Sequence, residues 1–208
     1  MNRCPRCFLY LRRCLCAHVP CVVTRTEIVI VRHTLERMKN SNTARLVALA
    51  LPRARIVDHP GPPPELPEDT WLLYPEGAAP AGPPPRCLVV LDGSWPQTRR
   101  MSQRIEWLRG LPRLALPAPT RPLPRLRVQR SAGGMSTLEA VSGALRLLEG
   151  EAVAEPLDRL MTTACRHHSG FELDSPRLAS LGPTRTHDSP GPTPAVHANN
   201  PPCSMMTT

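Results

Sequence analysis

The chain of 208 residues fits one ordinary domain with appendages better than two domains, and its 27 prolines exclude regular structure over part of that length. A hydrophobic fraction of 41% is enough for a core. The net charge of +9, carried almost wholly by arginine because Lys39 is the sole lysine, favours nucleic acid as a partner and an anionic membrane surface second. A GC-rich genome would produce the same arginine bias without any such partner.

The amino-terminal segment does not have the pattern of a signal peptide, because it is interrupted by arginines and lacks a continuous apolar core. No stretch of the chain approaches the roughly 18 apolar residues that span a bilayer. We therefore expect a cytoplasmic protein that does not enter a membrane. In that compartment thiols stay reduced, so disulfides are disfavoured.

Cysteines cluster in the first 21 residues in a pattern typical of a metal site. A Cys-x-x-Cys pair is followed after six residues by a Cys-x-Cys pair, and two such pairs can complete a tetrahedral zinc shell. Nearby arginines favour the thiolate form. A disulfide pair or unrelated buried thiols are the alternatives, and His18 and Cys21 are substitute ligands. A shell made only of thiolates leaves no open position, so we predict a structural zinc site. Its ligands are Cys4, Cys7, Cys14 and Cys16.

Short apolar runs alternate with amphipathic runs along the rest of the chain. This alternation predicts an α/β fold with a mostly parallel sheet and flanking helices. A proline-rich connector, 60–67, follows the second predicted strand, and another, 79–85, follows the third. The predicted strands are 27–31, 54–58, 71–75, 87–91 and 114–117, and the predicted helices are 41–51, 95–108, one that begins after residue 136, and 151–165.

Helix starts are marked by capping residues. Ser94 with Gln97, and Ser136 with Glu139, have the spacing of a capping box. Ser41 or Thr43 is expected to cap the helix at 41–51. The third predicted helix buries an apolar stripe: Leu138, Val141, Leu145 and Leu148.

The carboxyl-terminal region from residue 175 has no periodicity and is rich in Pro, Ser, Thr and Asn, so we predict that it is disordered. The expected organisation is therefore a Cys-rich head over 1–21, a main domain over 22–174, and a tail over 175–208.

The segment LVVLDGSW, 88–95, ends a predicted buried strand with a carboxylate and places an indole three residues later. Ligands of parallel sheets bind beyond the carboxyl ends of strands, and the helix after Ser94 presents free amides there. Taken alone, Asp92 and its neighbours are better explained by turn and capping chemistry without a ligand. Trp95 likewise suits either a stacking role or the core.

Further segments support the ligand interpretation: HTLERMKNSNTARL at 33–46, LLYP at 72–75 and GGMSTLEAV at 133–141. Together with the Cys-rich head and Leu-Asp-Gly-Ser-Trp, these blocks strongly resemble the DTW-domain family of tRNA-uridine aminocarboxypropyltransferases. The resemblance covers about residues 4–165. The family signature is Asp-x-Thr-Trp, and Ser94 in the threonine place keeps the hydroxyl but lacks the methyl.

The resemblance implies a SPOUT-like α/β fold that is knotted, a rare exception to unknotted topology. It also implies that S-adenosylmethionine donates a 3-amino-3-carboxypropyl group to N3 of a uridine in tRNA. The sequence contains neither a G-x-G-x-x-G fingerprint nor a phosphate loop, in agreement with this cosubstrate. No protein partner is predicted.

Roles for individual residues follow from the resemblance and from chemistry. We predict Asp92 as the general base, with its pKa raised by burial, and Trp95 as a stacking surface for uracil. Glu139 is a candidate for the amino group or sulfonium, although its capping role is the stronger interpretation. Further candidates for binding the cosubstrate or substrate are Ser94, Gly133, Gly134, Ser136 and Thr137, followed by His33, Glu36 and Asn42.

Other functions remain open from the sequence. A zinc-stabilised RNA-binding module without catalysis would share the head and the charge, but would not explain Asp-Gly-Ser-Trp. A related transferase acting on rRNA would share every motif. A methyltransferase would share the cosubstrate.

Overall fold

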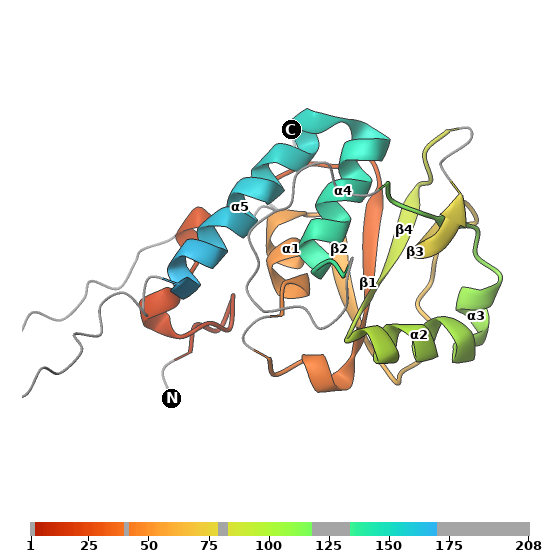
Figure 1. The fold of residues 1–208 in the computed structure, drawn as a ribbon, viewed down its shortest axis with the longest axis horizontal. Helices are drawn as coiled ribbons and strands as arrows, with labels where there is room; N and C mark the ends of the chain where they lie inside the picture. Colours follow the sequence, from red (N-terminus) through yellow and green to blue (C-terminus); the bar gives the residue numbers. More distant parts are fainter. Residues whose placement is uncertain (1–2, 40–41, 79–82, 118–133, 170–208) are drawn as a thin grey trace, which may run out of the picture.

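A single parallel sheet forms the centre of the molecule, shown in Figure 1. The computed structural model describes residues 3–39, 42–78, 83–117 and 134–169. Within them five strands lie in the order β2-β1-β4-β3-β5, and every neighbouring pair is parallel. The predicted α/β fold with a mostly parallel sheet is therefore confirmed. The strands are β1 (Glu27–His33), β2 (Ala54–His59), β3 (Thr70–Ala78), β4 (Cys87–Asp92) and β5 (Arg113–Leu114).

Helices cover both faces of this sheet. One hydrophobic cluster joins Ile30 of β1 and Val90 of β4 to α1, α4 and α5, and the other joins Val29 and Val89 to α2 and α3. Alternate residues of each central strand thus enter opposite cores, as expected for strands buried on both faces. The helices are α1 (Ala44–Ala50), α2 (Trp95–Arg104), α3 (Glu106–Arg109), α4 (Thr137–Glu149) and α5 (Glu151–Ser169), with short 3-10 turns η1 (Leu11–Arg13), η2 (Cys16–His18) and η3 (Thr34–Glu36).

The central strands β1 and β4 carry most of the core. Their apolar side chains are at most 3% exposed in β1 and in residues 87–90 of β4. Burying each Val, Ile or Leu side chain contributes about 1.5–3 kcal/mol, so these two strands anchor the sheet. On one face the predicted apolar stripe of α4 is buried against them.

Several predicted boundaries were wrong. The helix expected over 95–108 is two helices, because Ile105 has an extended backbone with ψ of 110° between α2 and α3. Its side chain is nevertheless buried, so apolar spacing alone could not distinguish a broken helix from a continuous one. α1 begins later than expected, α5 continues to Ser169, β3 is longer than predicted, and β5 is only two residues.

The Cys-rich head packs against the main body rather than standing apart from it. Cys4, Cys7 and Leu15 belong to the same hydrophobic cluster as the sheet and α5. The ring of His18 lies edge-on to that of His167 in α5, with 5.1 Å between centroids. The head is thus joined to the sheet by a shared core, whereas the predicted tail over 175–208 lies outside the described residues.

The carboxyl ends of β2, β1 and β4 meet at one edge of the sheet. Arg32 of β1 pairs in register with Asp58 on one side and with Asp92 on the other, and His33 pairs with His59. Because neighbouring side chains on a strand alternate, the two acids and Arg32 face α1 and α4, whereas the two histidines face α2. This edge, called here the carboxyl edge, therefore has two chemically different faces.

None of the helices in the described ranges combines the length and the apolar character that crossing a membrane requires.

Candidate active site and metal centre

Asp92 is the last residue of β4, and its carboxylate is held from both sides. Its side chain is only 6% exposed. Asn42 donates its amide N–H to Oδ2 at 2.6 Å, and the Thr137 hydroxyl donates to Oδ1 at 2.5 Å. Residues that are 50 and 45 positions away in the sequence thus orient one carboxylate.

The two donors are fixed by the helices that they precede or begin. Asn42 accepts the backbone N–H of Arg45 through Oδ1 at 3.2 Å, so its amide group faces Asp92. Thr43 occupies the N-cap position of α1 but makes no side-chain cap. Its hydroxyl instead accepts the backbone N–H of Leu138 at 3.3 Å. The hydroxyl therefore joins α1 to α4 instead of forming the cap expected of Thr43, and the alternative cap, Ser41, lies outside the described residues.

Burial raises the pKa of the Asp92 carboxyl above its ordinary value. The hydrogen bonds from Thr137 and Asn42 and the charge of Arg32 oppose this rise, and the charge of Glu36 adds to it. A carboxylate with a raised pKa is a stronger base than an exposed aspartate. It is therefore suited to removing a proton from a weakly acidic group.

The amino end of α4 is closed by the predicted capping box. The Ser136 N–H donates to Glu139 Oε2 at 2.7 Å, and the Glu139 N–H donates to Ser136 Oγ at 3.2 Å. The N–H of Leu138 is also engaged, by Thr43. Gly134 is half-buried just before this turn, whereas Gly133 lies outside the described residues. The cosubstrate contacts predicted for this segment remain predictions.

Trp95 is an exposed ring at the start of α2, with 47% of the residue accessible. One face of this ring lies against the ring of Tyr74 in β3, with ring centroids 6.1 Å apart and planes 15° from parallel. Tyr74 is itself buried, and the guanidinium of Arg113 lies 4.9 Å from its centroid. This stack leaves part of the Trp95 surface free, so packing in the core does not account for the residue.

The turn between Asp92 and Trp95 favours a glycine. A Cβ on Gly93 would lie 3.1 Å from Gln97 Cβ and 3.2 Å from Gln97 Oε1. That oxygen accepts the backbone N–H of Ser94 at 2.6 Å, which forms the predicted capping contact. Gly93 thus permits the close approach that fixes the start of α2.

The fold separates the last three candidate residues, His33, Glu36 and Asn42. Asn42 contacts Asp92 directly. Glu36 is 3% exposed and accepts from Lys39 Nζ at 2.5 Å, and its charge adds to the rise in the pKa of Asp92. His33 lies on the opposite face, where its Nδ1 accepts the Leu35 N–H at 3.2 Å.

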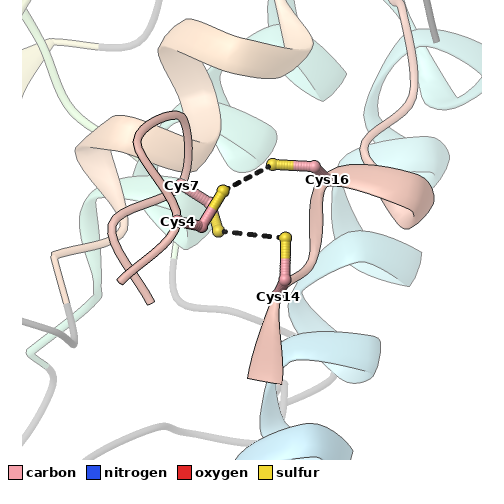
Figure 2. Close-up of side chains that lie close together, drawn as sticks. All are labelled: Cys4, Cys7, Cys14 and Cys16. Atoms are coloured by element: carbon pink, nitrogen blue, oxygen red, sulfur yellow. Dashed lines mark hydrogen bonds between the residues drawn. The ribbon is translucent and has the colours of Figure 1, made fainter. Parts of the chain in front are cut away.

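Four sulfur atoms converge in the head, as Figure 2 shows. All lie within 4.8 Å of one another, with 3.6 Å between Cys4 and Cys16 and 3.8 Å between Cys7 and Cys14. Tetrahedral zinc with Zn–S bonds of about 2.3 Å places its sulfurs about 3.8 Å apart. The predicted convergence of these thiols is confirmed, and His18 and Cys21 are not needed to complete the set.

The first Cys pair is held by a tight turn. The Phe8 N–H donates to the Cys4 carbonyl at 2.9 Å, and Phe8 has a φ of 63°. Such a φ is unfavourable for a non-glycine residue by roughly 1–2 kcal/mol, and the guanidiniums of Arg3 and Arg45 lie over the Phe8 ring at 5.1 and 4.4 Å. Stacking of the cations on this ring offsets the cost of the turn.

The thiols differ in acidity. Although burial opposes it, hydrogen bonds from the backbone of Cys7 and Arg6 and from the thiols of Cys14 and Cys16 lower the pKa of Cys4 to about 7. Burial raises the pKa of Cys14 and, more strongly, that of Cys16. The backbone of the turn thus helps to favour the first thiolate.

The sequence gives only weak signals for two features of the carboxyl edge. Tyr74 belongs to the LLYP block, and an aromatic residue near the end of a strand beside a predicted ligand site is a usable signal. For Asn42 the signal is weaker, because no local pattern shows that a residue before α1 reaches the end of β4.

Comparison with known proteins identifies the family of this chain. The model of the DTW domain matches residues 1–169. A tRNA-uridine aminocarboxypropyltransferase 2 of Drosophila melanogaster is 29% identical over 200 residues, covering 84% of this chain and 76% of that protein. The protein of the same name from Macaca fascicularis is 26% identical over 206 residues, covering 86% and 69%. No solved structure matches. The match over residues 1–169, which includes both the four thiols and Asp92, shows that the chain belongs to the DTW domain family.

Proposed function

We propose that this protein transfers the 3-amino-3-carboxypropyl group of S-adenosylmethionine to N3 of a uridine in tRNA. The names of its relatives support the reaction and the RNA class. The observation that carries the proposal is the buried Asp92 carboxylate at the carboxyl end of a central parallel strand, oriented by Asn42 and Thr137. Substrates of parallel-sheet proteins bind beyond such strand ends.

Asp92 acts as the general base in this proposal. A carboxylate accepts about four hydrogen bonds, so the contacts from Asn42 and Thr137 leave capacity for an imide N–H. As N3 bonds to the γ-carbon of the donor, its proton passes to Asp92, and the bond from that carbon to sulfur breaks. The sulfur leaves in a neutral thioether, 5′-methylthioadenosine. The positive charge of the sulfonium is therefore lost when the carbon–sulfur bond breaks, and the proton of N3 is held by Asp92.

Trp95 supplies the surface on which the uracil ring stacks. Stacking on an aromatic side chain is the usual way to hold an unstacked RNA base. The free surface of Trp95 and its support by Tyr74 favour this role over core packing. Because Trp95 is three residues from Asp92, the two side chains flank the same turn.

For the cosubstrate, we assign Gly133, Gly134, Ser136 and Thr137, with Ser94 on the facing turn. Thr137 supports this assignment because it contacts Asp92 directly. Glu139 closes the capping box, which favours a structural role for it. The SPOUT-like, knotted topology and the cytoplasmic location remain parts of the proposal. The insertion of β4 between β1 and the earlier strand β3 is compatible with that topology.

The head holds a structural zinc ion in this proposal. The four sulfurs fit the charge and spacing that zinc requires, and thiolates alone would leave no site for substrate. Because these cysteines also pack into the main core, loss of the metal would loosen the contact between the head and α5. Elemental analysis of the purified protein tests the assignment: about one zinc per chain is expected, and metal-free protein with all four thiols titratable would contradict it.

Nucleoside mass spectrometry tests the function. Bulk tRNA from cells with and without this protein should differ by one aminocarboxypropyl-uridine, and purified protein with S-adenosylmethionine should restore it. The matched control is the Asp92→Asn variant, which retains the size of the side chain. The same nucleoside in rRNA instead of tRNA, or RNA binding without calorimetric binding of S-adenosylmethionine, would replace the proposal with one of its rivals.

A further inference from the structure

A concave site lies on the α2 face of the carboxyl edge. It is a cavity of about 220 Å³ between the ends of β1 and β2 and the outer turns of α2. Its lining residues are His33, His59, Gln97, Arg100, Met101 and Arg104. None of the residues proposed above to bind the base or the cosubstrate belongs to this set.

The lining is basic. Two imidazoles and two guanidiniums contribute to it, and no carboxylate does. Within the described parts of the chain, neither Arg100 nor Arg104 forms an ion pair, whereas Arg32 on the other face is bound to Asp58 at 2.7 Å. α2 itself contains no acidic residue. Cations left without a counter-charge around a concavity attract an anion.

The cavity is joined to the Asp92–Trp95 turn by one side chain. Gln97 accepts the Ser94 N–H through Oε1, and its Nε2 lies 3.4 Å from His33 Nδ1. The basic lining is therefore held in a fixed relation to the turn that carries Asp92 and Trp95. A polymer with its base at that turn would place its neighbouring backbone near this cavity.

The size of the cavity restricts the anion. Pockets for whole small-molecule ligands are usually about 300–1,000 Å³, so this one is small for the entire cosubstrate. It suits a single phosphate group and part of its sugar. Guanidinium groups match phosphate oxygens in pairs, and such contacts position a nucleic acid without reading its sequence.

We propose that this cavity binds a backbone phosphate of the RNA strand that carries the target uridine. The inference rests on the proposed function, because it takes the polymer at the Asp92–Trp95 turn to be tRNA. It assigns His33 and His59 to the same phosphate as Arg100 and Arg104. The buried Asp92 face would then perform chemistry while the α2 face holds the strand in place.

The experiment compares two double variants of equal charge loss. Arg100→Gln with Arg104→Gln removes the cavity cations, and Arg53→Gln with Arg86→Gln removes two exposed arginines at the opposite, amino edge of the sheet. Binding of bulk tRNA from cells lacking this protein is measured at several salt concentrations, together with calorimetric affinity for S-adenosylmethionine and steady-state modification.

The cavity variant should reduce the slope of log K against log salt by about 0.7–0.9 for one lost phosphate contact. Its KM for tRNA should rise with kcat and affinity for S-adenosylmethionine unchanged, and the control variant should retain the slope of the wild type. Equal changes in both variants would overturn the inference, because they would show that tRNA is attracted by the overall positive charge of the protein and not by this cavity. A selective loss of S-adenosylmethionine affinity would overturn it in favour of the donor carboxylate. Absence of tRNA modification by the wild type would contradict the proposed function, whereas the slopes test the phosphate site separately.

Discussion

The two faces of the carboxyl edge are built from neighbouring residues of the same strands, yet they differ in burial and in the pairing of their charged groups. On the α1 and α4 face Asp92 is buried and receives hydrogen bonds from Asn42 and Thr137. On the α2 face Arg100 and Arg104 line an open cavity without ion pairs to the described residues.

This difference follows from strand geometry and from what packs on each side. Side chains alternate, so Arg32 enters one face and His33 the other. The first face is covered by helix ends whose polar groups pair with the strand ends, and the second is only partly covered by α2. A buried face can orient one reacting group, whereas an open basic face can attract a polymer. The predictions below test that division.

Replacing Asp92 with Asn should have the largest effect. General bases contribute about 10²–10⁴-fold, so modification of tRNA should fall by at least 100-fold. Affinity for tRNA and S-adenosylmethionine should stay near that of the wild type, because the side chain keeps its size. Single-turnover assays and calorimetry measure the two quantities. Retained activity would assign the base to another residue and remove the division between the faces.

Trp95→Ala should weaken tRNA binding by about 1–3 kcal/mol, the usual worth of one base stacked on an aromatic ring. Thermal stability should change little because the ring is half exposed. Trp95→Phe is the matched control and should retain part of the affinity. A large loss of stability with unchanged tRNA affinity would instead make Trp95 a structural residue.

Thr137→Val should destabilise the fold by about 1–3 kcal/mol, because a buried carboxylate oxygen loses its donor. The same change removes a hydrogen bond that lowers the pKa of Asp92, so that pKa should rise further. Thr137→Ser keeps the hydroxyl and should resemble the wild type. Chemical denaturation measures the stability, and the pH profile of kcat/KM measures the pKa. An unmoved profile would show that Thr137 does not influence the base.

The pH dependence of stability should show a smaller effect. Because the folded-state pKa of Asp92 is raised above 3.8, its protonated form favours folding. That contribution is fully present below the unfolded-state pKa and is lost as pH rises through the folded-state pKa. Wild type should therefore lose stability relative to Asp92→Asn as pH rises above about 4. Denaturant titrations of both proteins across this range measure the difference, and parallel curves would contradict a raised pKa.

Much of this organisation was determined by the sequence alone. Apolar runs bounded by turn residues predicted the strands, since a strand buried on both faces must be apolar throughout. The spacing of four cysteines predicted that their sulfurs converge, because two short Cys turns can each direct two sulfurs at one ion. The apolar run before Asp92 and the glycine after it predicted that Asp92 ends a strand.

Only the tertiary structure decided which distant residues surround that strand end. Asn42 and Thr137 reach Asp92 because α1 and α4 begin beside β4, and no local pattern specifies that meeting of helices. The basic cavity likewise forms only because the ends of β1 and β2 lie beside α2. Capping and periodicity are local properties of a chain, whereas the burial of a charge and the grouping of cations depend on packing between elements far apart in sequence.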